Sequence, residues 1–221
     1  MSNTTILRKL LALITLAAMS FAVQAQPALQ TLDRPLEQTY RVILPQKVET
    51  GDRIEVIDFF WYGCPFCYEL LPVFTDWESR KPADVAVRRI PAVLREAWVA
   101  DAHLYYTLEI LGEAERLHTK VFDAVHKDRL RTNDPQAVAL WAAQNGVDGQ
   151  KWLSTYTSDE VRKRVIQAVD FARSYDVRGT PAVIVDGRYQ TGGGLAGGLK
   201  NVPLVLDALV DLARQQRKKP L

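Results

Sequence analysis

Cys64 and Cys67 are the only cysteines in the sequence, and two residues separate them. A Cys-x-x-Cys pair can bind zinc or cycle between dithiol and disulfide. A zinc site normally needs four ligands, and the three histidines, at positions 103, 118 and 126, show no paired ligand spacing. Attachment of a c-type haem would need histidine directly after the second cysteine, where Tyr68 stands. A redox pair remains, and we expect it to need no metal and no other bound cofactor.

The two cysteines follow a stretch that has the composition of a buried strand. Residues 54–60 are apolar, β-branched and aromatic, and the apolar spacing after Cys64 predicts a helix that begins near Pro65. The Cys64 sulfur should then lie near free backbone amides at the positive end of the helix, which favours the thiolate. Cys67 lies one turn further on the same face. We therefore expect Cys64 to be the exposed, attacking sulfur and Cys67 the covered, resolving one.

Asp58 is the polar residue in the expected strand that requires an explanation. It alternates with Ile54, Val56 and Phe60, so its side chain should point to the same buried side of the sheet. Burial of a carboxylic acid raises its pKa. The alternative interpretation is that Asp58 lies near the strand end and reaches water.

The rest of the chain predicts two sheet-forming halves around a block of helices. Residues 85–90 suggest a second strand, which completes a strand–helix–strand unit. From about 95 to 175 the pattern is helical and predicts four or five packed helices. Strand character returns at 181–185, where a turn and a partner strand follow, and the last helix is expected over 202–213. A further edge strand is expected around 40–44.

The first 25 residues predict a secretory signal peptide. Two basic residues precede an apolar run over 10–23, and a small-residue triplet ends at Ala25. A transmembrane anchor is the alternative, but Thr15 and Ser20 interrupt a run that is shorter than the roughly 18 to 20 apolar residues that a span needs. We expect cleavage after Ala25.

Charge gives no support for nucleic-acid binding. The full chain has a formal net charge of +2. Loss of the two basic residues of the signal segment leaves a mature chain with a formal net charge of zero. Basic residues gather between Arg214 and Lys219, where we expect a solvated, frayed end.

Two segments resemble the DsbA family of periplasmic disulfide oxidoreductases. Residues 58–68, Asp-Phe-Phe-Trp-Tyr-Gly-Cys-Pro-Phe-Cys-Tyr, resemble the active-site segment of that family. Residues 176–190 resemble its loop before a cis-proline, with the strand and hairpin that follow. The resemblance implies an α/β protein with a thioredoxin fold and an inserted all-helical domain. The thioredoxin-like domain would comprise residues 26–96 and 169–221, the helical insertion 97–168, and the signal peptide 1–25.

The resemblance also implies roles for residues outside the cysteine pair. Pro181 would be the cis-proline that packs beside Cys64, and Thr180 would present its backbone to a bound substrate chain. Asp58, six residues before the first cysteine, would accept the proton of the buried thiol.

Pro65 and Phe66, the two residues between the cysteines, would tune the redox potential. The commonest family pattern has histidine where this chain has Phe66. A phenyl ring cannot donate a hydrogen bond or a positive charge to the Cys64 thiolate. The strength of the protein as an oxidant is therefore left open.

By this resemblance the chain would donate disulfides to reduced or unfolded exported proteins in the periplasm. A DsbB-type inner-membrane partner would reoxidise it, and we expect a monomer that binds no nucleic acid. A periplasmic reductase or isomerase is one alternative, although residues 26–50 are too short for the dimerisation domain of the well-known isomerases. A chaperone-like, peptide-binding module with an incidental disulfide is the alternative from a different class.

Overall fold

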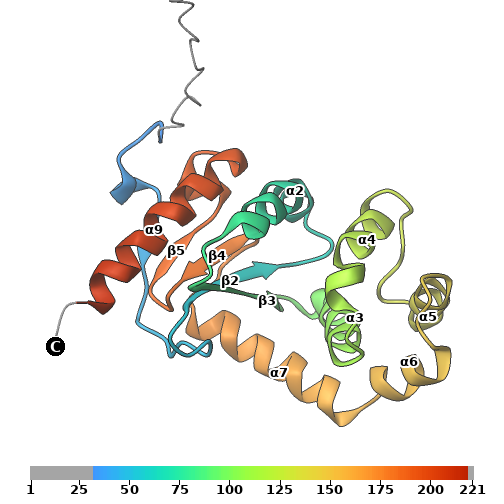
Figure 1. The fold of residues 1–221 in the computed structure, drawn as a ribbon. Coiled ribbons are helices and arrows are strands. Elements are labelled where there is room, and N and C mark those ends of the chain that lie inside the picture. The colour runs from blue at the N-terminus through green and yellow to red at the C-terminus, as the bar shows by residue number, and fades with distance from the viewer. Residues whose placement is uncertain (1–31, 219–221) are drawn as a thin grey trace, which may run out of the picture. The chain divides into compact units, whose positions relative to one another are not determined.

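The sheet is built around strand β2 (Ile54–Phe60), whose seven side chains are all buried. The computed structural model describes residues 32–218. The sheet has five strands in the order β1-β5-β4-β2-β3 (Figure 1). Strand β3 (Val85–Pro91) runs parallel to β2, and β4 (Ala182–Val185) runs antiparallel to it. The strands expected near residues 54, 85 and 181 are therefore confirmed.

The remaining two strands are short. Strand β5 (Tyr189–Thr191) pairs with β4 across the expected turn, and β1 (Arg41–Val42) forms the edge beyond β5. The edge strand expected around residues 40–44 is present, but it pairs over only two residues. The signal peptide, its cleavage at Ala25 and the extreme C-terminus lie outside the described residues.

Helices cover both faces of the sheet. Helix α2 (Pro65–Arg80) and helix α9 (Val202–Arg217) pack with Ile54 and Val56 in one apolar cluster, and Figure 1 shows both helices on one side of the strands. On the other face Phe59 contacts Tyr175, which caps the C-terminus of helix α7 (Asp159–Ser174). Because α2 follows β2 directly, the sheet and this helix together position Cys64.

The helical block between β3 and β4 contains five helices, in agreement with the expected four or five. They are α3 (Val99–Ile110), α4 (Ala114–His126), α5 (Pro135–Gln144), α6 (Gly149–Tyr156) and α7. The short helices are η1 (Leu36–Gln38), η2 (Glu96–Trp98), α8 (Gly193–Ala196) and η3 (Leu199–Asn201). The boundary expected at residue 168 falls inside α7, and the division into two domains stays a prediction. None of the helices within residues 32–218 combines the length and the apolar character required to cross a bilayer.

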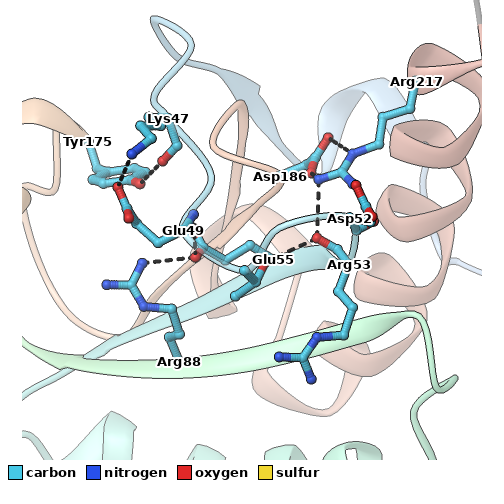
Figure 2. A network of polar contacts seen from close by, with 10 residues as sticks. Lys47, Glu49, Asp52, Arg53, Glu55, Arg88, Tyr175, Asp186 and Arg217 are labelled. Atoms are coloured by element: carbon cyan, nitrogen blue, oxygen red, sulfur yellow. Dashed lines mark hydrogen bonds and ion pairs between the residues drawn. The ribbon is translucent and has the colours of Figure 1, made fainter.

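Ion pairs hold the end of the sheet that lies away from the cysteines (Figure 2). Arg217 pairs with Asp186 and donates hydrogen bonds to the carbonyls of Asp52 and Arg53. Arg214 pairs with Asp84 at 2.7 Å. The expectation of a frayed basic end is therefore wrong for these two arginines, because each finds an acidic partner beside the ends of the strands.

The same end contains a fully buried carboxylate. Glu55 accepts hydrogen bonds from Arg88 at 2.8 Å and from the backbone amide of Glu49 at 3.2 Å (Figure 2). A buried charge is tolerated when it is paired in this way. Glu55 therefore links the start of β2 to Arg88 on β3 and to the backbone of Glu49, at the end of the sheet away from the cysteines.

Candidate active site

Cys64 caps the N-terminus of α2, and Pro65 is the first helical residue, as the sequence predicts. The Cys64 sulfur accepts a hydrogen bond from the backbone amide of Cys67 at 3.4 Å. The Cys64 thiol also donates to the carbonyl of Thr180 at 3.3 Å. Both cysteines are free thiols in this structure. The helix end therefore brings together an amide donor and two sulfurs, as a redox pair requires.

The expectation that Cys64 is exposed is wrong in this structure. Cys64 is 5% exposed and Cys67 is 4% exposed, so both residues are buried. The cause is the direction of the Cys64 side chain, which turns toward Thr180 and the Cys67 amide instead of toward water. Phe66, at 58% exposed, is the side chain that projects from this turn.

The two thiols nevertheless differ strongly in acidity. Hydrogen bonding from the Cys67 thiol, with further hydrogen bonds from the Thr180 side chain and the amides of Cys67 and Phe66, outweighs burial and lowers the pKa of Cys64 to about 6. Burial, followed by the hydrogen bond to Cys64 and the negative charge on that sulfur, raises the pKa of Cys67. Near neutral pH one sulfur is therefore a thiolate, and its neighbour holds a proton.

Asp58 is buried behind the cysteine pair, at 7% exposure. Burial raises the pKa of Asp58 to about 6, against the opposing positive charge of Arg89, and the negative charge of Glu78 adds to the increase. Its Oδ1 atom has no hydrogen-bond partner. A small cavity of about 10 Å³ is lined by Asp58, Cys67 and Pro181 together with apolar side chains. The alternative that Asp58 reaches water is therefore wrong.

The peptide bond between Thr180 and Pro181 is cis, as the resemblance implied. Two contacts fix the loop before it. Asp176 accepts hydrogen bonds from Arg41 on β1, at 2.6 Å, and from Arg178. These contacts hold the loop that places the Thr180 carbonyl against the Cys64 sulfur.

The sequence did not identify the support of the segment before Cys64. The Trp61 indole donates to the buried carboxylate of Asp101 at 2.9 Å and stacks on Trp98 with a centroid distance of 4.3 Å. A Cβ atom on Gly63 would overlap the Trp61 ring, so any other residue there would require the indole to shift. An acidic residue in the mainly apolar sequence of α3 was the available signal for Asp101.

Two histidines support Tyr62 in the same segment. His118 Nδ1 lies 3.1 Å from the Tyr62 hydroxyl, and His126 Nε2 lies 2.8 Å from the Tyr62 carbonyl. Burial, and then the nearby charge of Arg89, lowers the pKa of His118 to about 3, so His118 is neutral. Over residues 32–218 the structure contains no group of three or more histidine, cysteine or acidic side chains that could hold a metal ion.

Comparisons with known proteins agree with this geometry. A family model described as a DSBA-like thioredoxin domain matches residues 55–210. The thiol:disulfide interchange protein DsbA of Azotobacter vinelandii is 36% identical over 212 residues, covering 94% of this chain and 99% of its own length. The corresponding Bordetella pertussis protein is 36% identical over 220 residues, covering 97% of this chain and 100% of its own.

Solved structures of similar proteins have the same fold. The crystal structure of Pseudomonas aeruginosa DsbA matches with a TM-score of 0.78 at 35% identity, over 82% of this chain and 95% of that one. The oxidoreductase DsbA from Xylella fastidiosa matches with a TM-score of 0.75 at 30% identity, over 80% of this chain and 96% of that one.

Proposed function

The chain belongs to the DsbA family of thiol:disulfide interchange proteins, and from this premise we propose that Cys64 and Cys67 form the redox pair that donates its disulfide to other proteins. The observation that carries the proposal is the opposite direction of the two pKa shifts. A lowered pKa at Cys64 makes its sulfur the better leaving group and the better nucleophile at neutral pH, whereas Cys67 retains its proton.

The reaction begins from the oxidised pair. A substrate thiolate attacks the Cys64 sulfur, a new disulfide forms between substrate and Cys64, and the bond to Cys67 breaks, so that Cys67 leaves as a thiolate. Asp58, whose pKa is about 6, supplies the proton that Cys67 takes up. A second substrate thiolate then attacks the substrate sulfur of the mixed disulfide and releases Cys64 as thiolate. Two electrons pass from the substrate dithiol to the cysteine pair.

The substrate chain is proposed to bind beside the cis-proline. The Thr180 carbonyl lies 3.3 Å from the Cys64 sulfur and accepts its hydrogen bond when the thiol is protonated, and Pro181 lines the small cavity beside Cys67. Once Cys64 is in a disulfide this carbonyl is free for a backbone N–H of the substrate, so an extended peptide can bind there through main-chain hydrogen bonds.

The proposed setting is the periplasm, after removal of a signal peptide near Ala25. The substrates are reduced, exported proteins. Because the protein leaves each cycle as a dithiol, a DsbB-type inner-membrane partner is proposed to reoxidise it. The protein is proposed to act as a monomer, with a helical domain formed by residues 97–168 inserted into its thioredoxin domain.

A trapping experiment tests the residue roles. The Cys67→Ser variant is first loaded with an aromatic thiol as a mixed disulfide on Cys64. A thiolate of reduced, unfolded ribonuclease should attack the Cys64 sulfur, release the aromatic thiol and leave a covalent ribonuclease–Cys64 complex that accumulates. Cys64→Ser should form none. The wild-type oxidised protein should restore ribonuclease activity. Equal activity of Cys64→Ser and wild type would overturn the redox proposal in favour of a chaperone-like module.

The role of Asp58 has its own test. Asp58→Asn should keep the trapping reaction at Cys64 but slow the step in which Cys67 attacks the mixed disulfide, because no carboxylate is left to accept its proton. Stopped-flow reoxidation of the reduced variant measures that step. A variant that reoxidises at the wild-type rate throughout pH 5 to 8 would remove Asp58 from the mechanism.

A further inference from the structure

An ion pair of α2 and β3 lies next to Asp58. The Arg89 guanidinium donates two hydrogen bonds to the Glu78 carboxylate, one to Oε1 at 3.4 Å and a closer one to Oε2. Both side chains are mostly buried, with 19% of Arg89 and 24% of Glu78 exposed. This is a bidentate ion pair, a geometry that fixes a guanidinium in one position.

Arg89 occupies the position directly beside Asp58 in the sheet. The two residues are register partners in the parallel pair of β2 and β3, so their side chains emerge on the same face, where α2 packs. The register partner of Asp58 on β4 is Val183, which carries no charge. The charged or titratable groups that face Asp58 are therefore Arg89 from β3 and Glu78 and Cys67 from α2.

A cation beside a buried acid would normally stabilise the carboxylate strongly and leave it unable to hold a proton. Here Glu78 binds that cation instead. Asp58 has no hydrogen-bond partner for its Oδ1 atom and makes no ion pair within residues 32–218. The negative charge of Glu78 therefore opposes the effect of the Arg89 charge on Asp58 and offsets part of it.

We propose that Glu78 is a positioning residue of the redox site, which holds and neutralises the Arg89 guanidinium so that Asp58 can carry a proton for Cys67. This inference deepens the proposed function and rests on it for the role of Asp58. It predicts opposite effects for the two members of one ion pair. Loss of the Glu78 charge exposes Asp58 to the full field of Arg89, whereas loss of the Arg89 charge exposes it to Glu78.

The test measures the protonation of Asp58 directly. The carboxyl carbons of aspartate are labelled with ¹³C in the reduced, full-length mature protein, and the Asp58 signal is identified by its absence in Asp58→Asn. Glu78→Gln should lower the midpoint of that signal by on the order of one pH unit, and Arg89→Gln should raise it by a similar amount. Glu78→Asp and Arg89→Lys, which keep the charges, should stay near the wild-type midpoint.

The exposed pair of Asp76 and Arg80 on the same helix provides the matched control. Asp76→Asn should leave the Asp58 midpoint unchanged. An unchanged midpoint in Glu78→Gln, or shifts of the same sign in Glu78→Gln and Arg89→Gln, would overturn the proposal. Because the titration needs no substrate, it can support the role of Glu78 even if Asp58→Asn reoxidises normally, so the two proposals fail separately. If Arg89→Gln does not fold, Glu78→Gln, at a partly exposed helix position, still decides the sign.

Discussion

Replacement of Cys64 by serine should remove a stabilisation of the reduced protein that depends on pH. A thiol whose pKa is lower in the folded chain than in the unfolded chain contributes stability above the unfolded pKa and loses it as the pH falls to the folded pKa. The pKa of Cys64 is lowered to about 6 by hydrogen bonds from the Cys67 thiol and its neighbours. A free cysteine titrates near 8.5. The window of the effect is therefore about pH 6 to 8.5.

The size of the effect follows from these two values. A gap of about 2.5 pKa units corresponds to about 3 kcal/mol once both states are ionised, near pH 8.5 and above. At pH 7 the folded thiol is mostly ionised and the unfolded one is not, so about 1.4 kcal/mol should already be present. Below about pH 5.5 the contribution should vanish.

Urea denaturation of wild type and Cys64→Ser, both under excess reductant, measures the effect at several pH values. The substitution also changes stability by an amount that does not depend on pH. On top of that constant, the difference in unfolding free energy between the two proteins should rise by about 1.2 kcal/mol from pH 5.5 to pH 7. Titrations of Asp58 and of surface groups are common to both proteins and largely cancel. A difference that stays flat over this range would refute the assignment of a lowered pKa to Cys64.

Two further substitutions test other parts of the site. Phe66→His should raise the redox potential by tens of millivolts, because an imidazole can stabilise the Cys64 thiolate and about 30 mV corresponds to 1.4 kcal/mol for a two-electron couple. Equilibration with glutathione measures the potential, and an unchanged or lower value would contradict the tuning role. Gly63→Ala should destabilise the fold by about 1–3 kcal/mol, because the added Cβ overlaps the Trp61 ring. Thermal unfolding measures the loss of stability, and a Tm equal to that of wild type would show that the indole moves freely.

The elements around the site could be predicted from the sequence because their signals are local. The apolar run before Cys64 and the proline after it mark a buried strand and a helix start, and both lie where expected. Alternation along β2 placed Asp58 on a buried side of the sheet, and it is buried. The cis bond before Pro181 came from the family resemblance, since an isolated sequence gives no reason to expect it.

Other features depend on contacts between distant positions. The hydrogen bond of Trp61 to Asp101 joins residues 40 positions apart, and the pair of Glu78 and Arg89 joins a helix to the next strand. No periodicity encodes such pairs. The exposure of Cys64 was mispredicted for the same reason, because the loop that ends at Thr180, 116 positions away, determines where its sulfur points.

The relative stability of the two redox forms tests the oxidase role most directly. The redox potential of the Cys64–Cys67 pair differs between the folded and the unfolded chain. A thermodynamic cycle requires this difference, expressed as a free energy, to equal the difference in folding free energy between the oxidised and reduced forms. DsbA is itself the established example of a strong oxidant whose reduced form is stabilised, so this trend belongs to the family. The measurement is a pair of denaturant melts at pH 7, one on the oxidised protein and one under excess reductant, with Cys64→Ser as the control for the reductant. The reduced form should be the more stable, against the usual stabilisation by a disulfide. A more stable oxidised form would contradict the oxidase role and indicate a reductase.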